Sequence, residues 1–223
     1  MVSMKLNKNI KRIKILSLIA IAATFSLTFA NANAAGDAKA GEELSQTCLG
    51  CHGAPGLRNP GPVYSIPMLG GQNAEYLVIA LKAYKDKTRS HSTMQAQAAS
   101  LTEQNMEDIA AYFSQSKSDS RPSLVNKELA AIGKKAAVTC VACHGADGAS
   151  TTADSFPILA GQYESYLLHA LKGYRSGERQ NAIMNGFMKE LGIKDLKALA
   201  AWFASQESEK GVNAPETKIF KFK

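Results

Sequence analysis

The sequence predicts an all-α fold built from two similar domains in tandem. A pattern of residues recurs once along the chain at an offset of about 90 positions, which indicates an internal repeat. Apolar residues within each copy recur at helical spacing, and no run alternates polar and apolar residues for long enough to predict a sheet. A chain of 223 residues has room for two small domains of this kind.

Three stretches define the repeat. The first reads Gly-x6-Cys-x-x-Cys-His and recurs after 92 positions, whereas Pro-x-Leu-x-Gly-Gln and Tyr-Leu-x-x-Ala-Leu-Lys-x-Tyr recur after 90. The matching segments are 41–52 with 133–144, 67–72 with 157–162, and 76–84 with 166–174. The change of offset predicts a loop after the cysteine motif that is two residues shorter in the second copy.

The repeat and the local composition divide the chain into five segments. They are a signal peptide at 1–35, a first domain at 36–117, a linker at 118–126, a second domain at 127–208 and a C-terminal tail at 209–223. The linker is expected because the residues around Pro122 are polar. Each copy has about 85–90 residues, too few for a large hydrophobic core unless an apolar group is added to it.

The first 35 residues have the pattern of a secretory leader. Five basic residues precede an apolar run at 15–30, and small residues follow with a cleavage site near Ala34, so export to the periplasm is expected. The apolar run is short for a spanning helix, although an uncleaved anchor is the alternative. Without the leader, 21 basic residues face 19 acidic ones instead of a net charge of +7, so no nucleic-acid partner is expected.

Three pairs of helices are expected from the apolar periodicity. One helix of each pair belongs to each copy, and Thr102 is placed to cap the first helix of the last pair. The expected ranges are 38–48 with 128–140, 74–85 with 164–175, and 103–115 with 195–206.

Each copy contains the sequence Cys-x-x-Cys-His, which is the attachment motif of c-type haem. On one helical turn the two cysteines can form thioethers with a porphyrin, and the histidine that follows can face its iron. The second imidazole nitrogen then needs an acceptor, for which we expect a carbonyl near Pro67 or Pro157. Two covalently bound haem c groups are therefore predicted. The motif residues are Cys48, Cys51 and His52 in the first copy and Cys140, Cys143 and His144 in the second.

Other chemistries of paired cysteines fit this sequence less well. A zinc site would need both pairs, but 88 residues separate them and each pair lies within its own repeat. A thioredoxin-like dithiol does not require a histidine directly after its second cysteine. Disulfides are common in exported proteins, yet the two motifs use all four cysteines.

The repeat also selects a second axial ligand for each iron. Met94 and Met184 align at the offset of 90, so we expect these two thioethers to bind iron opposite the histidines. Met188 is the alternative at the second haem, because it lies one helical turn after Met184. His91 and His169 have no counterparts and are expected at the surface or at a haem edge. The methionines without counterparts are Met68, Met106 and Met188.

These motifs, with the Pro67 and Pro157 loops and the tyrosines at 84 and 174, resemble the dihaem class I cytochrome c family, of the cytochrome c4 type. The resemblance covers nearly the whole chain after the leader. It implies two tandem class I domains related by a pseudo-twofold axis. It also implies a periplasmic one-electron carrier that connects a quinol-oxidising complex with a terminal oxidase or reductase, in some members at the membrane surface.

The expected partners are a redox donor and a redox acceptor, and the sequence leaves the oligomeric state open. With histidine and methionine on the two sides of each iron, no position stays open for oxygen, peroxide or nitrite. We therefore expect an electron-transfer protein and not an enzyme. The alternative is the cytochrome subunit of a flavin-containing sulfide dehydrogenase, or another dihaem oxidoreductase.

Overall fold

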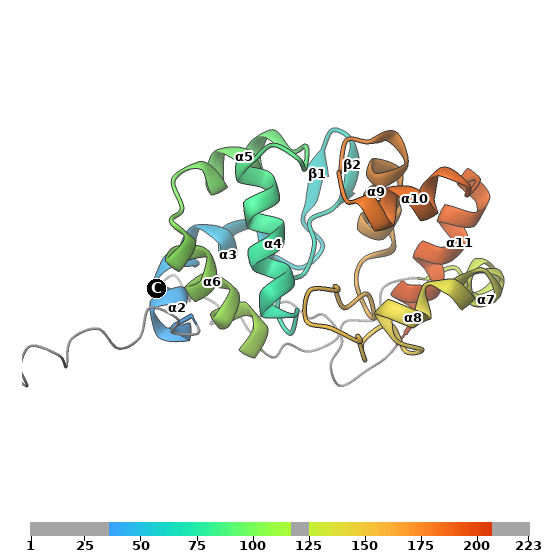
Figure 1. The fold of residues 1–223 in the computed structure, drawn as a ribbon, viewed down its shortest axis with the longest axis horizontal. Helices are drawn as coiled ribbons and strands as arrows, with labels where there is room; N and C mark the ends of the chain where they lie inside the picture. Colours follow the sequence, from blue (N-terminus) through green and yellow to red (C-terminus); the bar gives the residue numbers. More distant parts are fainter. Residues whose placement is uncertain (1–35, 117–124, 207–223) are drawn as a thin grey trace, which may run out of the picture. The chain divides into compact units, whose positions relative to one another are not determined.

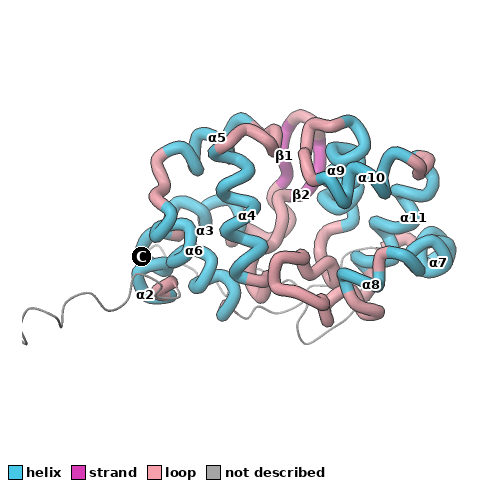
Figure 2. The backbone as a smooth tube through the Cα atoms, in the orientation of Figure 1, coloured by secondary structure: helices cyan, strands magenta, loops and turns pink. Residues whose placement is uncertain are grey.

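The computed structural model describes residues 36–116 and 125–206 (Figure 1). The predicted leader, most of the predicted linker and the predicted tail lie outside these ranges. Helices make up nearly all the regular structure of the described part (Figure 2), which confirms the all-α prediction.

The two halves contain the same succession of helices. In the first half they are α2 (Ala38–Leu44), α3 (Gln46–His52), α4 (Ala74–Lys85), α5 (Ser92–Ala99) and α6 (Glu103–Gln115). In the second half they are α7 (Lys127–Ala136), the 3-10 helix η1 (Ala137–Thr139), α8 (Val141–His144), α9 (Glu164–Ser176), α10 (Ala182–Lys189) and α11 (Ile193–Ala204). The ranges expected for α4 and α6 match the structure, and Thr102 caps α6 as predicted.

The structure corrects the sequence analysis at three places. The helix expected to lead into each cysteine motif is broken, at Ser45 in the first half and by η1 in the second. Two short helices, α5 and α10, were not expected. The prediction that the chain makes no sheet is wrong for one hairpin, in which β1 (Arg58–Pro60) pairs antiparallel with β2 (Val63–Ser65). This hairpin occupies the loop that is two residues longer in the first half.

The first and last helices of each half cross at very close range. Helix α2 packs on α6 through Gly41, where an added Cβ would overlap the carbonyl oxygen of Asp108. Helix α7 packs on α11 in the same way through Gly133, where a Cβ would overlap the carbonyl oxygen of Ala198. The glycines that open the repeat are therefore required by helix packing.

Each half has a small core on the inner faces of its helices. In the first half, Leu77 of α4 packs against Ile109 and Phe113 of α6. The second half repeats this at an offset of 90, with Leu167 of α9 packed against Leu199 and Phe203 of α11. These cores are small, which fits the expectation that each half needs an added apolar group.

The halves contact each other through pairs of reciprocal hydrogen bonds. The Ser90 N–H donates to the Glu178 carbonyl oxygen and the Gln180 N–H donates to the Thr88 carbonyl oxygen, each at 2.8 Å. Shifting the residue numbers by the repeat offset of 90 converts each bond into the other, so the two halves make the same contact with each other. Reciprocity of this kind is what a twofold relation between the halves requires.

Candidate haem sites

A cavity of about 790 Å³ is lined by residues of both halves. All eight side chains that the sequence predicts as site residues line it. They are Cys48, Cys51, His52 and Met94 from the first half and Cys140, Cys143, His144 and Met184 from the second. The structure therefore brings together, around one apolar space, the residues that the repeat selected.

The end of α3 buries His52 and holds its ring in one orientation. The imidazole Nδ1 lies 2.7 Å from the carbonyl oxygen of Pro67. Because a carbonyl can only accept, Nδ1 must bear the proton and Nε2 must have the free lone pair that a metal needs. Burial also lowers the pKa of His52, which favours the neutral ring.

His144 is held in the same way at the end of α8. Its Nδ1 lies 3.0 Å from the carbonyl oxygen of Pro157, and burial lowers the pKa of this ring too. The acceptors expected near Pro67 and Pro157 are thus the proline carbonyls themselves. Both histidines line the cavity.

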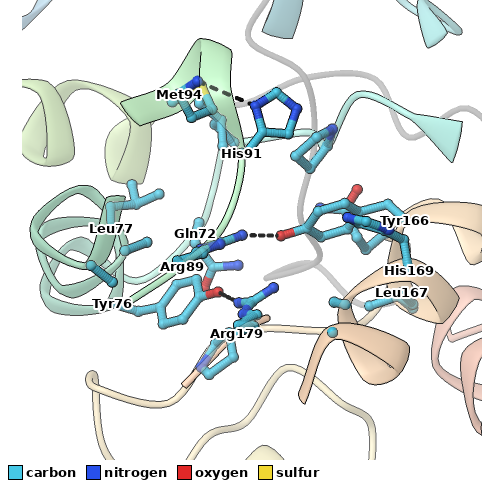
Figure 3. Close-up of a pocket in the computed structure, with 18 of the residues that line it drawn as sticks. Gln72, Tyr76, Leu77, Arg89, His91, Met94, Tyr166, Leu167, His169 and Arg179 are labelled. Carbon is cyan, nitrogen blue, oxygen red and sulfur yellow. Dashed lines mark hydrogen bonds between the residues drawn. The ribbon is translucent and has the colours of Figure 1, made fainter. Parts of the chain in front are cut away.

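The two methionines lie in the first turn of matching short helices, each as the third residue. The His91 side chain caps α5 by accepting from the Met94 N–H at 3.2 Å (Figure 3), and the Asn181 side chain caps α10 by accepting from the Met184 N–H at 3.0 Å. Both methionines are half-buried and line the cavity. Met188 is 1% exposed and also lines the cavity.

Two arginines that the sequence analysis did not single out also line the cavity. Arg89 Nη2 donates to the Tyr166 hydroxyl and Arg179 Nη2 donates to the Tyr76 hydroxyl, each at 2.6 Å and each across the two halves (Figure 3). The backbones of the two arginines form an antiparallel β-bridge. Both arginines and both tyrosines share the offset of 90, so a fuller comparison of the two copies would have found them.

These guanidiniums create a positive region without a protein anion. Arg89 is only 8% exposed, and among the described residues neither Arg89 nor Arg179 has a carboxylate within 4.0 Å. Burial alone would raise the pKa of Tyr166, but the two guanidiniums outweigh it and lower that pKa to about 8. A buried charge needs a counter-charge, so this region is suited to an anionic group.

The donor set therefore fits haem c. The apolar walls suit a porphyrin, the paired cysteines suit its two thioether bonds, and the neutral imidazoles suit its iron. The buried guanidiniums of Arg89 and Arg179 suit its propionates. None of the four cysteines forms a disulfide, so all of them are available for thioether bonds.

The remaining histidines lie near the cavity without matching each other. His91 caps α5, whereas the ring of His169 stacks on Tyr64 of the hairpin at 3.9 Å between centroids and 9° between planes. This stack joins the two halves. The contact has no counterpart in the repeat, so the sequence comparison gave no signal for it.

A family model for cytochrome c matches this chain twice, at residues 38–117 and 130–207. The chain belongs to the cytochrome c family. A cytochrome c4 from Stutzerimonas stutzeri is 38% identical over 205 residues, which cover 83% of this chain and 96% of the relative. The crystal structure of reduced recombinant cytochrome c4 from Pseudomonas stutzeri superimposes with a TM-score of 0.68 and 31% identity, over 78% of this chain and all of the other.

A third relative has a more specific name. A thiosulfate dehydrogenase electron acceptor from Thiomonas intermedia is 29% identical over 174 residues, which cover 72% of this chain and 78% of the relative.

The predicted dihaem, cytochrome c4-like family is thereby confirmed. This cytochrome binds two covalent haem c groups and transfers electrons; it is not an enzyme. Within the described ranges, no helix is both long and apolar enough to cross a membrane.

Proposed function

We propose that this cytochrome is a periplasmic one-electron carrier between a quinol-oxidising complex and a terminal oxidase or reductase. The observation that supports it best is that each half contributes a buried histidine and a methionine to the lining of one cavity. His52 with Met94, and His144 with Met184, would fill both axial positions of each iron. No position would then remain for a substrate, and only electrons would be exchanged.

The chain's residues would fix the geometry of both sites. Cys48, Cys51, Cys140 and Cys143 would hold the porphyrins covalently. The proline carbonyls would keep each imidazole in one tautomer and orientation. When bound, each haem supplies a one-electron couple between ferrous and ferric iron. A site whose ligands stay in place in both states needs little reorganisation when the electron moves.

Met184 is proposed as the ligand of the second haem in preference to Met188. Met184 occupies the same position on α10 as Met94 on α5, three residues after the capping residue. Met188 aligns with Ala98, which is fully buried in the first half. A ligand at Met188 would therefore place the two sites differently in two halves that otherwise correspond.

The proposed processing follows the segments of the sequence. Residues 1–35 would direct export and be removed near Ala34. The domains would span 36–117 and 127–208, joined by a linker at 118–126 and followed by a tail at 209–223. N-terminal sequencing of the periplasmic protein tests the cleavage, and a chain that begins at Met1 would contradict it.

A second candidate donor follows from the relative named as a thiosulfate dehydrogenase electron acceptor. In that reading a sulfur-oxidising dehydrogenase would reduce this cytochrome in the periplasm. A flavin-containing sulfide dehydrogenase, with this chain as its cytochrome subunit, belongs to the same group of donors.

Stopped-flow reduction distinguishes these donors. The oxidised cytochrome is mixed with membranes that contain a quinol-cytochrome c reductase, or with a purified thiosulfate or sulfide dehydrogenase and its substrate. We expect the faster reduction with the quinol-oxidising membranes, sensitive to inhibitors of the quinol site. Faster reduction by a dehydrogenase, or co-purification with a flavoprotein, would favour the second candidate.

A further inference from the structure

One glutamine side chain from each half forms hydrogen bonds with the backbone of the other half. The Gln162 amide oxygen accepts from the Met68 N–H at 3.1 Å, and its Nε2 donates to the Met68 carbonyl oxygen at 2.9 Å. The mirror contact joins the Gln72 side chain to Ile158, with distances of 2.8 Å for the accepted N–H and 3.0 Å for the donated one.

Both amides are buried and fixed. Gln162 is 3% exposed and Gln72 is 5% exposed, so neither can exchange these bonds for bonds to bulk water. The amide oxygen of Gln162 also accepts from the Tyr163 N–H, and that of Gln72 accepts from the Asn73 N–H. Each glutamine therefore has a single orientation, set at the start of α9 or α4.

The peptide group that each glutamine binds is also the one that orients a haem histidine. The Pro67 carbonyl and the Met68 N–H belong to one peptide unit, whose oxygen accepts from His52 Nδ1 and whose N–H donates to Gln162. In the other half, the unit between Pro157 and Ile158 binds His144 and Gln72 in the same manner. A continuous hydrogen-bond chain thus connects each histidine with the opposite half.

Hydrogen bonds in such a chain polarise one another. An acceptor on the N–H side of a peptide makes its carbonyl oxygen a stronger acceptor. A stronger acceptor at Nδ1–H makes the imidazole a more basic ligand, which stabilises ferric iron relative to ferrous iron. The amide of one half would therefore act on the redox equilibrium of the other half.

We propose that Gln72 and Gln162 are positioning residues that fix the orientation and the basicity of the axial histidine in the opposite half. Gln162 orients and polarises the carbonyl that binds His52, and Gln72 does the same for His144. The two haems are then coupled through the protein backbone in addition to any coupling through space. This inference rests on the proposed histidine ligation.

The test uses the complete dihaem protein with Gln162→Leu and, as its mirror, Gln72→Leu. Two quantities are measured for each haem: its midpoint potential, and the proton chemical shift of its histidine Nδ1–H in the diamagnetic reduced protein. Gln162→Leu should move the His52 Nδ1–H resonance upfield and favour the ferrous state of that haem. We expect a change of up to about tenfold in the redox equilibrium, or about 59 mV for a one-electron couple.

Ser165→Ala is the matched control, because Ser165 also lies on α9 and bonds across the halves. Its hydroxyl accepts from the Ser65 N–H at 3.0 Å but does not touch the peptide unit of either histidine. This variant should leave both Nδ1–H resonances unchanged. The inference is overturned if Ser165→Ala gives the shift of Gln162→Leu, or if Gln162→Leu affects His144 as much as His52.

Gln162→Glu keeps the test decisive if the leucine variant does not fold. Its carboxyl oxygen can still accept from the Met68 N–H, so the His52 Nδ1–H resonance should stay in place or move downfield. An upfield shift with this variant would overturn the inference. In all variants, a low-spin spectrum with histidine and methionine ligands shows that the proposed ligation holds. If the unsubstituted protein lacks that spectrum, the proposed function is overturned instead.

Discussion

The two halves of this cytochrome agree in how they hold the histidines and in the arginine–tyrosine bonds between them, and they differ after the cysteine motif and at the rim of the cavity. Both hold a histidine on a proline carbonyl, and both extend an arginine to a tyrosine of the other half. After the cysteine motif they diverge. The first half has the β1–β2 hairpin, whereas the second has a short turn in which Asp147 accepts from the Ala149 and Ser150 N–H groups.

The rim of the cavity differs as well. On α10, Ile183 is 54% exposed and Phe187 is 48% exposed, and both side chains line the cavity. The equivalent residues on α5 are Thr93 and Gln97, which are polar. The difference indicates that the same proposed ligand scheme has different surroundings in the two haem sites. We therefore expect two distinct midpoint potentials.

Removal of one pair of cysteines should have the largest effect on this comparison. Cys140→Ser combined with Cys143→Ser removes both thioether bonds of the second haem, and the small core of that half loses its largest apolar component. The intact mass of the periplasmic protein should fall by one haem, and the second half should lose its thermal unfolding transition. The mirror variant, Cys48→Ser with Cys51→Ser, should do the same to the first half. Retention of two haems would contradict the assignment.

Substitution of the methionine ligand should have the next largest effect. Met184→Leu removes the proposed sulfur ligand, so the ferric protein should lose about half of its sulfur-to-iron charge-transfer absorption and the second midpoint potential should fall. Met188→Leu is the control, since a buried Met-to-Leu change usually costs less than about 1.5 kcal/mol and would leave the band intact. Loss of the band in Met188→Leu alone would assign the ligand to Met188.

Neutralisation of one buried arginine should have an intermediate effect. Arg89→Gln removes a positive charge beside the cavity and leaves the Tyr166 hydroxyl with a weaker partner. Loss of this positive charge should lower the haem midpoint potential, because a nearby positive charge stabilises the ferrous state. The free energy of unfolding should fall by about 1–3 kcal/mol. Redox titration and chemical denaturation measure the two effects. Lys172→Gln, on α9, loses the same charge at a different position, and an equal shift with this variant would argue against a specific role for Arg89.

Exchange of the rim residues should have the smallest effect. Ile183→Thr with Phe187→Gln gives α10 the rim of α5, which admits water and should lower the second potential slightly. Thr93→Ile with Gln97→Phe should raise the first potential. Potentiometry of both variants would show whether the gap between the two potentials changes. A gap that stays the same in both would show that the rim does not cause the difference.

The internal repeat made most of this molecule predictable from sequence. It located the cysteine motifs, the histidines, Met94 and Met184, and all eight predicted site residues line the cavity. It worked because residues that would attach a bound group, or that pair reciprocally across a twofold axis, are subject to the same constraint in both halves. Arg89 and Arg179 also recur at the offset of 90, but they belong to no recognised motif, so the sequence analysis did not predict them as site residues.

The remaining features could not be predicted in this way. The hairpin and the stack of His169 on Tyr64 have no counterpart in the other half. Helix α5 has little amphipathic character, so its apolar pattern gives almost no signal, and its capping residue is a histidine and not one of the usual short polar residues. The paired contacts of Gln72 and Gln162 are visible only in the structure, because the repeat in the sequence does not show which backbone groups the two glutamines bind.

A spectroscopic redox titration of the mature protein, with cyanide added to the ferric form, is the most direct test of two electron-carrying haems with both axial positions filled. We predict two one-electron steps, low-spin spectra in both oxidation states, sulfur-to-iron absorption equivalent to two methionine ligands, and little binding of cyanide. A high-spin haem that binds cyanide rapidly would contradict this account and indicate a site for catalysis.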